Sequence, residues 1–206
     1  MGIVCPVGPV LIASFLKARA VLGRLLGRGL FVTMLLIAWS PGTPAEPSSN
    51  QLQYRVMAGY LCNFAGFVEW PTSAFEGRDS PLIVGVVGDD AFASELERVA
   101  KGQKFAGRSL EIRRLKRVDS DSTIHILFID ESAVEEARRV FKELRGKPIL
   151  TVTDSEAVFT QGAMINFVVV DDRVRFDVAP SRAETSQLHI NARLLTAANR
   201  VLPRPM

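Results

Sequence analysis

The sequence predicts a single three-layer α/β domain, with a mixed, mostly parallel sheet flanked by helices and a C-terminal hairpin and helix. Short, continuous apolar runs recur along the chain, and strands of this kind are buried on both faces of a parallel sheet. Amphipathic segments of helical period lie between these runs. Strands that alternate with helices build a sheet covered by helices on both faces, and we therefore expect this architecture.

The first element predicted is a helix over residues 51–70, which contains no proline. Pro71 should end this helix, because proline lacks the N–H group and clashes with the preceding turn. The apolar residues that recur at helical spacing are Leu52, Val56, Tyr60, Phe64, Phe67 and Val68. The apolar run 82–87 follows as a buried strand, and residues 88–90 then form a turn and N-cap that begin a helix over 91–100.

The remaining elements follow from the same two patterns, which are apolar runs for strands and apolar residues at helical spacing for helices. The short polar connection 171–173 between two apolar runs is typical of a hairpin. Pro203 should end the last helix. In chain order we expect strands at 109–115 and 123–129, a helix at 132–144, a strand at 148–152, the hairpin strands 163–170 and 174–178, and a helix at 190–201.

Residues 1–45 have the layout of a secretory signal peptide. An apolar run over 29–39 follows a basic start, and Thr43 and Ala45 then provide a small-residue cleavage site. The run is well short of the roughly 20 residues that span a bilayer, so a retained anchor is the less favoured alternative. We expect export to the periplasm and cleavage of 1–45, a Pro/Ser-rich linker at 46–50, and the α/β domain at 51–203.

Removal of the leader changes the charge of the protein. The whole chain carries 25 Lys and Arg against 22 Asp and Glu, and the leader holds four of the basic residues and no acidic one. The remaining chain would have 21 basic against 22 acidic residues, close to neutral. Nucleic-acid-binding domains need clustered basic charge, so we expect no nucleic-acid partner.

The residue types that carry catalysis and metal binding are scarce. After the leader, Cys62 is the sole cysteine and lies among apolar residues, which favours a buried, free thiol. His125 lies within a buried strand pattern and His189 precedes the last helix, so neither indicates ligation. No metal-ligand spacing and no nucleophile motif is present. We therefore expect no catalytic residue, no metal and no cofactor.

Two sets of residues are candidates for binding. Trp70, at a predicted helix end, could anchor a protein partner together with Met164, Phe176 and Arg175. Asp89 follows a buried strand, and small ligands bind at the carboxyl edge of such sheets. A ligand there would contact Asp89, Asp154 and Gly162, although helix capping is the commoner role for an aspartate in the position of Asp89.

Through most of the predicted domain the sequence resembles the YfiR family of periplasmic regulators. The matching residues are Tyr60, 63–65, Phe67, Val68, Trp70, Pro71, 87–92, 107–108, 112–114, 125–129, 150–154, 162–165, Phe167, Arg175, Phe176 and 188–195. The resemblance implies an α/β domain that dimerises and does not catalyse. It also implies that the domain holds a membrane-bound diguanylate cyclase inactive from the periplasm, which lowers cyclic di-GMP and restrains biofilm formation.

The sequence departs from its relatives at positions that bear on redox control. Ile124 stands where several relatives carry a disulfide-forming cysteine, Cys62 stands where an aromatic residue is usual, and Ala163 replaces a common glycine. The differences at Ile124 and Cys62 argue against control through such disulfides, whereas Ala163 bears on the shape of its loop. Two hypotheses follow: a repressor that binds the periplasmic part of a cyclase, or a periplasmic sensor that binds a small, unknown ligand and serves another membrane partner.

Overall fold

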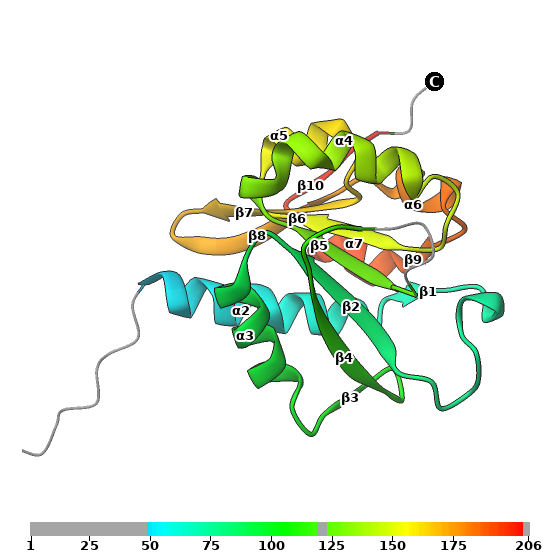
Figure 1. The fold of residues 1–206 in the computed structure, drawn as a ribbon. Helices are drawn as coiled ribbons and strands as arrows, with labels where there is room; N and C mark the ends of the chain where they lie inside the picture. Colours follow the sequence, from blue (N-terminus) through cyan, green and yellow to red (C-terminus); the bar gives the residue numbers. More distant parts are fainter. Residues whose placement is uncertain (1–48, 119–122, 204–206) are drawn as a thin grey trace, which may run out of the picture. The chain divides into compact units, whose positions relative to one another are not determined.

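The computed structural model describes residues 49–118 and 123–203, which lie in one unit of the chain, residues 47–206 (Figure 1). The helices are α2 (Ser49–Phe64), α3 (Asp90–Ala100), α4 (Val134–Glu143), α5 (Glu156–Gln161), α6 (Pro180–Thr185) and α7 (Ala192–Ala197), with 3₁₀ turns η1 (Thr72–Ala74) and η2 (Glu131–Ala133). The strands are β1 (Val68–Glu69), β2 (Leu82–Val87), β3 (Lys104–Phe105), β4 (Arg108–Leu115), β5 (Ile126–Ile129), β6 (Leu150–Thr153), β7 (Ile165–Val170), β8 (Arg173–Val178), β9 (His189–Ile190) and β10 (Arg200–Val201).

The main sheet has eight strands in the order β10-β8-β7-β6-β5-β2-β4-β3. The pairings from β4 through β2, β5 and β6 to β7 are parallel, whereas β7–β8 and β3–β4 are antiparallel. After β2 the chain adds β4 on one side and then returns to add β5 on the other. The boundary between β2 and β5 is therefore a topological switch point, where ligands commonly bind at the carboxyl edge of a sheet.

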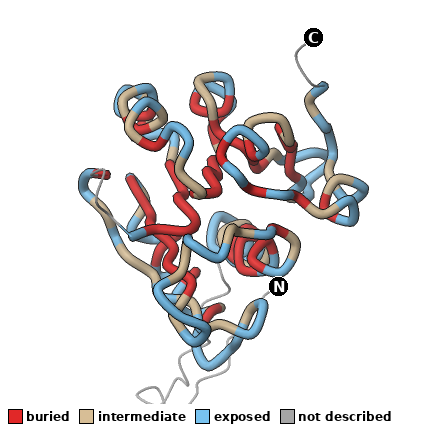
Figure 2. Tube along the Cα trace, turned by 90° about the vertical axis from the view of Figure 1, so that its right-hand side faces the viewer, coloured by how far each residue is buried: buried red, intermediate tan, exposed pale blue. Residues whose placement is uncertain are grey.

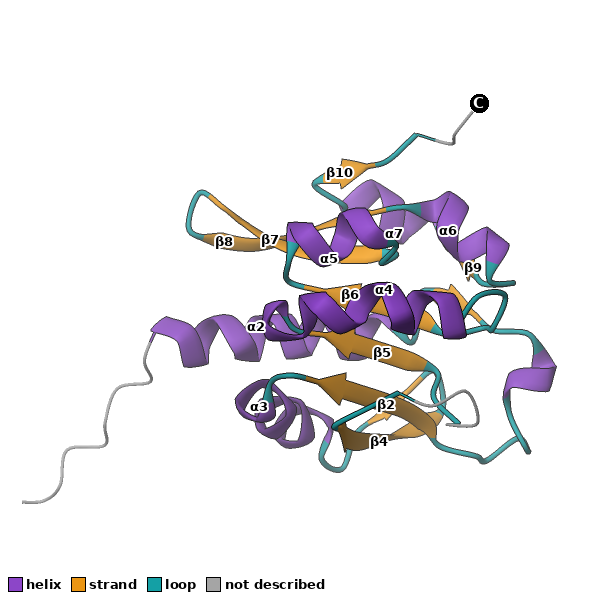
Figure 3. Ribbon diagram, turned by 45° about the horizontal axis from the view of Figure 1, so that its top comes forward, coloured by secondary structure: helices purple, strands orange, loops and turns teal. Residues whose placement is uncertain are grey.

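Helices cover both faces of this sheet, which confirms the predicted three-layer α/β class (Figure 1 and Figure 3). One apolar core lies between the sheet and helices α2 and α3, with Leu61 and Phe92 fully buried. A second core lies on the other face, where α4 and α5 contribute Val140 and Phe159. Figure 2 shows the buried residues gathered along the central strands between these helices. Every residue of β2 and β5 is buried, as their continuous apolar runs predicted, and the four residues of β6, two of them threonines, are buried as well.

The helix predicted over residues 51–70 is wrong at its C-terminal end, because α2 stops at Phe64. Turn hydrogen bonds of the i→i+3 type follow, from the N–H groups of Ala65, Gly66 and Phe67. The chain then extends into β1, which pairs antiparallel with β9, 120 residues further along the sequence. The backbone hydrogen bonds of β9 stabilise the extended conformation, and the helix therefore ends well before Pro71.

The final helix predicted at 190–201 is confirmed only over α7, because short strands replace it at both ends. Residues His189–Ile190 form β9, and Asn191 then caps α7 by accepting a hydrogen bond from the N–H of Arg193 at 2.9 Å. The chain ends as β10, parallel to β8. The predicted hairpin at 171–173 is confirmed, and Asp171 and Asp172 take the positive φ values that a tight turn needs, 49° and 57°.

The predicted signal peptide at 1–45 lies outside the described residues, as does most of the predicted linker. Helix α2 already begins at Ser49, inside that linker. Within the described part of the chain, no helix combines the length and the apolarity that a membrane crossing requires.

Candidate functional site

Exposed apolar side chains from α2 and from the β7–β8 hairpin gather at one place on the surface. Leu52 is 53% exposed and Val169 is 55% exposed, and Val56 on α2 is exposed as well. These three residues line a hollow of about 570 Å³ together with Arg173 and Arg175 of β8. We call these five residues the hairpin surface.

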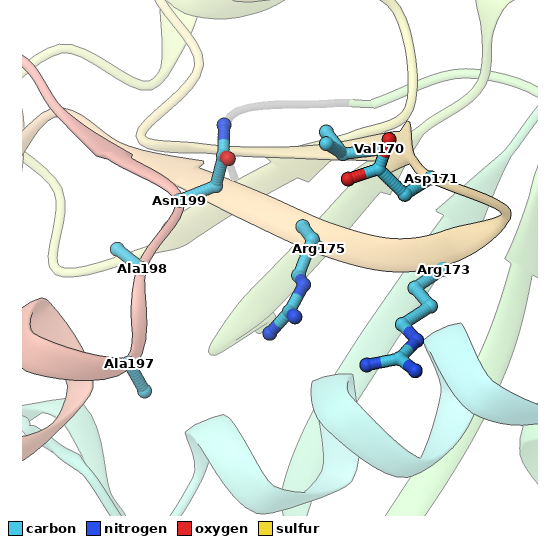
Figure 4. Close-up of a pocket in the computed structure, with 7 residues that line it drawn as sticks. All are labelled: Val170, Asp171, Arg173, Arg175, Ala197, Ala198 and Asn199. Carbon is cyan, nitrogen blue, oxygen red and sulfur yellow. The ribbon is translucent and has the colours of Figure 1, made fainter.

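Arg173 and Arg175 lie on the same side of β8, because alternate residues of a strand point the same way. Figure 4 shows both guanidinium groups extending from the strand in one direction, whereas the carboxylate of Asp171 points away from them. The two arginines also border a second hollow of about 550 Å³, which reaches Ala197 and Asn199. The hairpin surface therefore combines an apolar strip with positive charge, and it suits a partner that is apolar with acidic groups nearby.

The structure separates the predicted partner-binding residues. Arg175 is exposed on the hairpin surface. Phe176 is 2% exposed and Met164 is 5% exposed, so the prediction that they form an exposed patch is wrong. Phe176 packs edge-on against Phe64, with ring centroids 5.2 Å apart, because it faces the α2 side of the sheet. Trp70 is half-buried and its Nε1 donates a hydrogen bond to the carbonyl of His125 at 3.3 Å.

Carboxylates gather at the carboxyl edge of the central strands. Asp89 follows β2, Asp130 follows β5 and Asp154 follows β6. Asp89 Oδ1 accepts the N–H of Phe92 at 2.8 Å, which confirms its capping role at α3. Asp130 Oδ1 likewise accepts the N–H of Ser132 at 2.9 Å. By contrast, Asp154 Oδ1 is buried and has no hydrogen-bond partner.

The electrostatics of this edge follow from its negative charge. Burial, followed by the neighbouring charges of Asp130, Asp89 and Glu131, raises the pKa of Asp154 to about 6. The hydrogen bond from Tyr54 to Asp89, followed by burial, raises the pKa of the Tyr54 phenol. Asp154 therefore lies within a group of carboxylates that disfavour its ionisation.

Asp154 lines a cavity of about 480 Å³ between α2 and β7. Its wall also includes Asn166, which is only 1% exposed. Asn166 Nδ2 donates to Glu156 at 2.9 Å, but Asn166 Oδ1 is buried without a partner. We call this the acidic cavity, and its other lining residues are Gln53, Met57, Glu131, Glu156, Phe167, Val168, Val169 and Val174.

The predicted ligand residues Asp89 and Asp154 thus lie close enough to interact electrostatically, but of the three predicted ligand residues only Asp154 lines the cavity, and Asp89 and Gly162 do not. Gly162 follows α5 with a φ of 149°, and a Cβ there would lie 3.2 Å from the ring of Phe141. Its role is therefore close packing. Sequence reasoning missed Asn166 and Asp130, although Asp130 follows a buried strand as Asp89 does.

The remaining candidates for chemistry are held in structural roles. Burial raises the pKa of the Cys62 thiol to about 12, so this side chain is protonated at neutral pH. Both ring nitrogens of His125 lie within hydrogen-bond distance of backbone groups. Among residues 49–118 and 123–203, no group of three or more His, Cys, Asp and Glu side chains is placed to hold a metal ion.

The family model described as YfiR/HmsC-like matches residues 54–199, which run from the first turns of α2 to the residue before β10. A search of curated proteins finds no match.

Proposed function

This chain belongs to the YfiR/HmsC-like family of periplasmic regulator domains, and from that premise we propose that it binds a membrane-bound diguanylate cyclase and holds it inactive. A lower cyclase activity would reduce cyclic di-GMP and restrain biofilm formation. We further propose that residues 1–45 are removed on export, and that the domain works in the periplasm as a homodimer without catalysing a reaction.

The hairpin surface is the observation that supports a protein partner. Exposed apolar side chains that cluster together mark interaction sites more often than single ones do. Leu52, Val56 and Val169 form such a cluster, which Arg173 and Arg175 border. Arginine is enriched among the residues that dominate binding energy at interfaces. We therefore place the contact with the periplasmic part of the cyclase at this surface.

A role without catalysis is consistent with the state of the reactive side chains. The family is one of regulators rather than catalysts. The thiol of Cys62 is buried and protonated, and it therefore lacks the thiolate that a cysteine nucleophile needs. Trp70 stays a candidate for partner contact because its ring is only half-buried.

The test combines capture of the partner with a measurement of its product in the native host. A photocrosslinking amino acid at position 169 of the full chain should capture the cyclase, which mass spectrometry then identifies. Deletion of the gene should raise cyclic di-GMP, and the wild-type chain should restore the original level. If no cyclase is captured and deletion leaves cyclic di-GMP unchanged, the assignment to a cyclase is wrong.

A pair of matched substitutions tests the surface itself. Val169→Asp should prevent restoration, because a buried charge at the centre of an interface commonly lowers affinity by roughly 30-fold or more. Val201→Asp is the control, since Val201 is also an exposed large apolar residue but lies on β10, outside the hairpin surface. Equal loss of function in the two variants would contradict the proposed contact site.

A further inference from the structure

The acidic cavity contains two buried oxygens that nothing in the described structure satisfies. These are Oδ1 of Asp154 and Oδ1 of Asn166, and both residues line the same hollow. Nearly all buried polar atoms in folded proteins have a hydrogen-bond partner, so an exception calls for a physical explanation. Because Asn166 is 1% exposed, bulk water does not supply that partner.

The charges around these oxygens are unevenly balanced. Glu156 has positive and polar partners, because Arg200 approaches it at 3.3 Å and Asn166 donates to it at 2.9 Å. Asp154 has only a backbone hydrogen bond to stabilise its charge, and the charged groups that act on it are the carboxylates of Asp130, Asp89 and Glu131. The cavity therefore presents uncompensated negative charge together with unfilled acceptor positions.

These properties define what the cavity can bind. Both unsatisfied atoms are acceptors, so the occupant must donate hydrogen bonds, and a positive charge would offset the carboxylates. A bare metal ion fits poorly, because no set of three or more ligating side chains is arranged for it in the described residues. Met57 and Phe167 also line the hollow and offer an apolar wall for a carbon chain.

We propose that the acidic cavity binds a small organic cation, with an ammonium or guanidinium group that donates to Asp154 and Asn166 and an apolar stem against Met57 and Phe167. The cavity lies at the carboxyl end of β6, beside β7, and the carboxyl ends of parallel strands are where small ligands are commonly held. This inference goes beyond the proposed function and does not depend on the cyclase.

The cavity also shares lining residues with the hollow at the hairpin surface. Gln53, Val169 and Val174 line both hollows, so an occupant of the acidic cavity would contact residues next to the proposed partner site. A ligand that binds the free and the partner-bound domain with different affinity shifts the equilibrium between them. Binding of the cation would thus change the affinity of the domain for its partner without any change in the fold.

Isothermal titration calorimetry with the purified protein, expressed from the full chain, tests the proposal. The probes are 1,4-diaminobutane, agmatine and lysine, with 1,4-butanediol as the uncharged counterpart and magnesium chloride as the metal. At least one of the three cations should bind saturably at pH 7.5, and neither the diol nor magnesium should do so. The absence of saturable heat with all three cations would overturn the proposal, and so would binding of magnesium or the diol alone.

Three substitutions locate the site. Asp154→Asn should weaken binding of the cation at least tenfold, and Glu131→Gln, at an exposed position on the cavity wall, should weaken it severalfold. Asp171→Asn is the matched control, because it removes one negative charge from the hairpin turn outside the cavity. Circular dichroism establishes that each variant is folded. Wild-type affinity in both cavity variants would contradict this assignment, whatever the outcome of the cyclase experiment.

Discussion

The aromatic ring of Phe75 lies nearly parallel to the imidazole of His125, with centroids 4.4 Å apart and 14° between the planes. The guanidinium carbon of Arg108 lies 3.8 Å from the centroid of the Phe75 ring. His125 Nδ1 accepts the N–H of Ile83 at 3.0 Å, and its Nε2 lies 2.9 Å from the carbonyl of Ala74. Because that carbonyl can only accept, Nε2 carries the proton and the imidazole is neutral.

This arrangement predicts that acid destabilises the domain through His125. Burial is the largest cause that lowers the pKa of His125 below its ordinary value of 6.5, and the charges of Arg108 and Arg113 act in the same direction. The unfolded chain therefore binds a proton near pH 6.5 that the folded chain does not yet bind, and the free energy of unfolding falls as the pH decreases below that value. Urea denaturation at pH 7.5 and 5.5 measures the change.

His125→Gln is the matching variant, since the amide can accept from Ile83 and donate to Ala74 without titrating. The loss of unfolding free energy between pH 7.5 and 5.5 should be smaller in this variant than in the wild type. Because Asp154 titrates in both proteins, its contribution cancels in the comparison. An identical loss in the two proteins would mean that the neutral state of His125 does not stabilise the fold.

For Asp154 the sign is opposite. Its pKa is raised to about 6 by burial and by neighbouring carboxylates, so the folded chain holds a proton that the unfolded chain has already released. The contribution of Asp154 to the free energy of unfolding therefore falls as the pH rises from about 4 to 6. Asp154→Asn should stabilise the domain at pH 7.5 by about 1–2 kcal/mol, and this gain should shrink towards pH 4. Equal stability of variant and wild type at pH 7.5 would contradict the unfavourable charge.

Trp70 allows a structural role to be distinguished from partner contact. The carbonyl of His125 accepts two hydrogen bonds, one from the indole of Trp70 and one from the N–H of Leu150 at 2.9 Å. It therefore keeps a hydrogen-bond donor when the indole is removed. Trp70→Phe should therefore cost only about 1 kcal/mol of unfolding free energy. Trp70→Ala also removes the ring that packs on Phe75 and should cost about 2–3 kcal/mol. Cooperative melting at the wild-type temperature in Trp70→Ala, with loss of partner capture, would instead identify Trp70 as a partner contact.

Gly162 should matter for stability and not for ligand binding. Its φ of 149° and the ring of Phe141 at 3.2 Å from an added Cβ both oppose a side chain. Gly162→Ala should lower the free energy of unfolding by about 1–3 kcal/mol, with unchanged calorimetric affinity for the organic cation. Gly146→Ala is the control for backbone strain, because its φ is also positive but an added Cβ meets nothing within 4 Å. A greater effect at Gly146 would contradict the packing argument.

Local patterns in the sequence were sufficient for the central strands. The apolar run at Leu82–Val87 is confirmed residue for residue as β2, because a strand buried on both faces needs apolar side chains at every position. The aspartates that follow it begin α3, as the capping preference of Asp89 predicted. Helices α5 and α6 were missed, since six residues are too few to establish a helical period.

The sequence alone determined the alternation of buried strands and amphipathic helices, and with it the α/β class. The reason is that the spacing of apolar residues along the chain indicates which face of an element is buried. Only the tertiary structure decided which residues meet. The extended segment after Phe64 depends on β9 as its pairing partner, and Phe176 is buried because α2 covers that face of the sheet. The acidic cavity likewise exists only because β6 and β7 run side by side, which brings Asp154, just after β6, close to Asn166 near the start of β7.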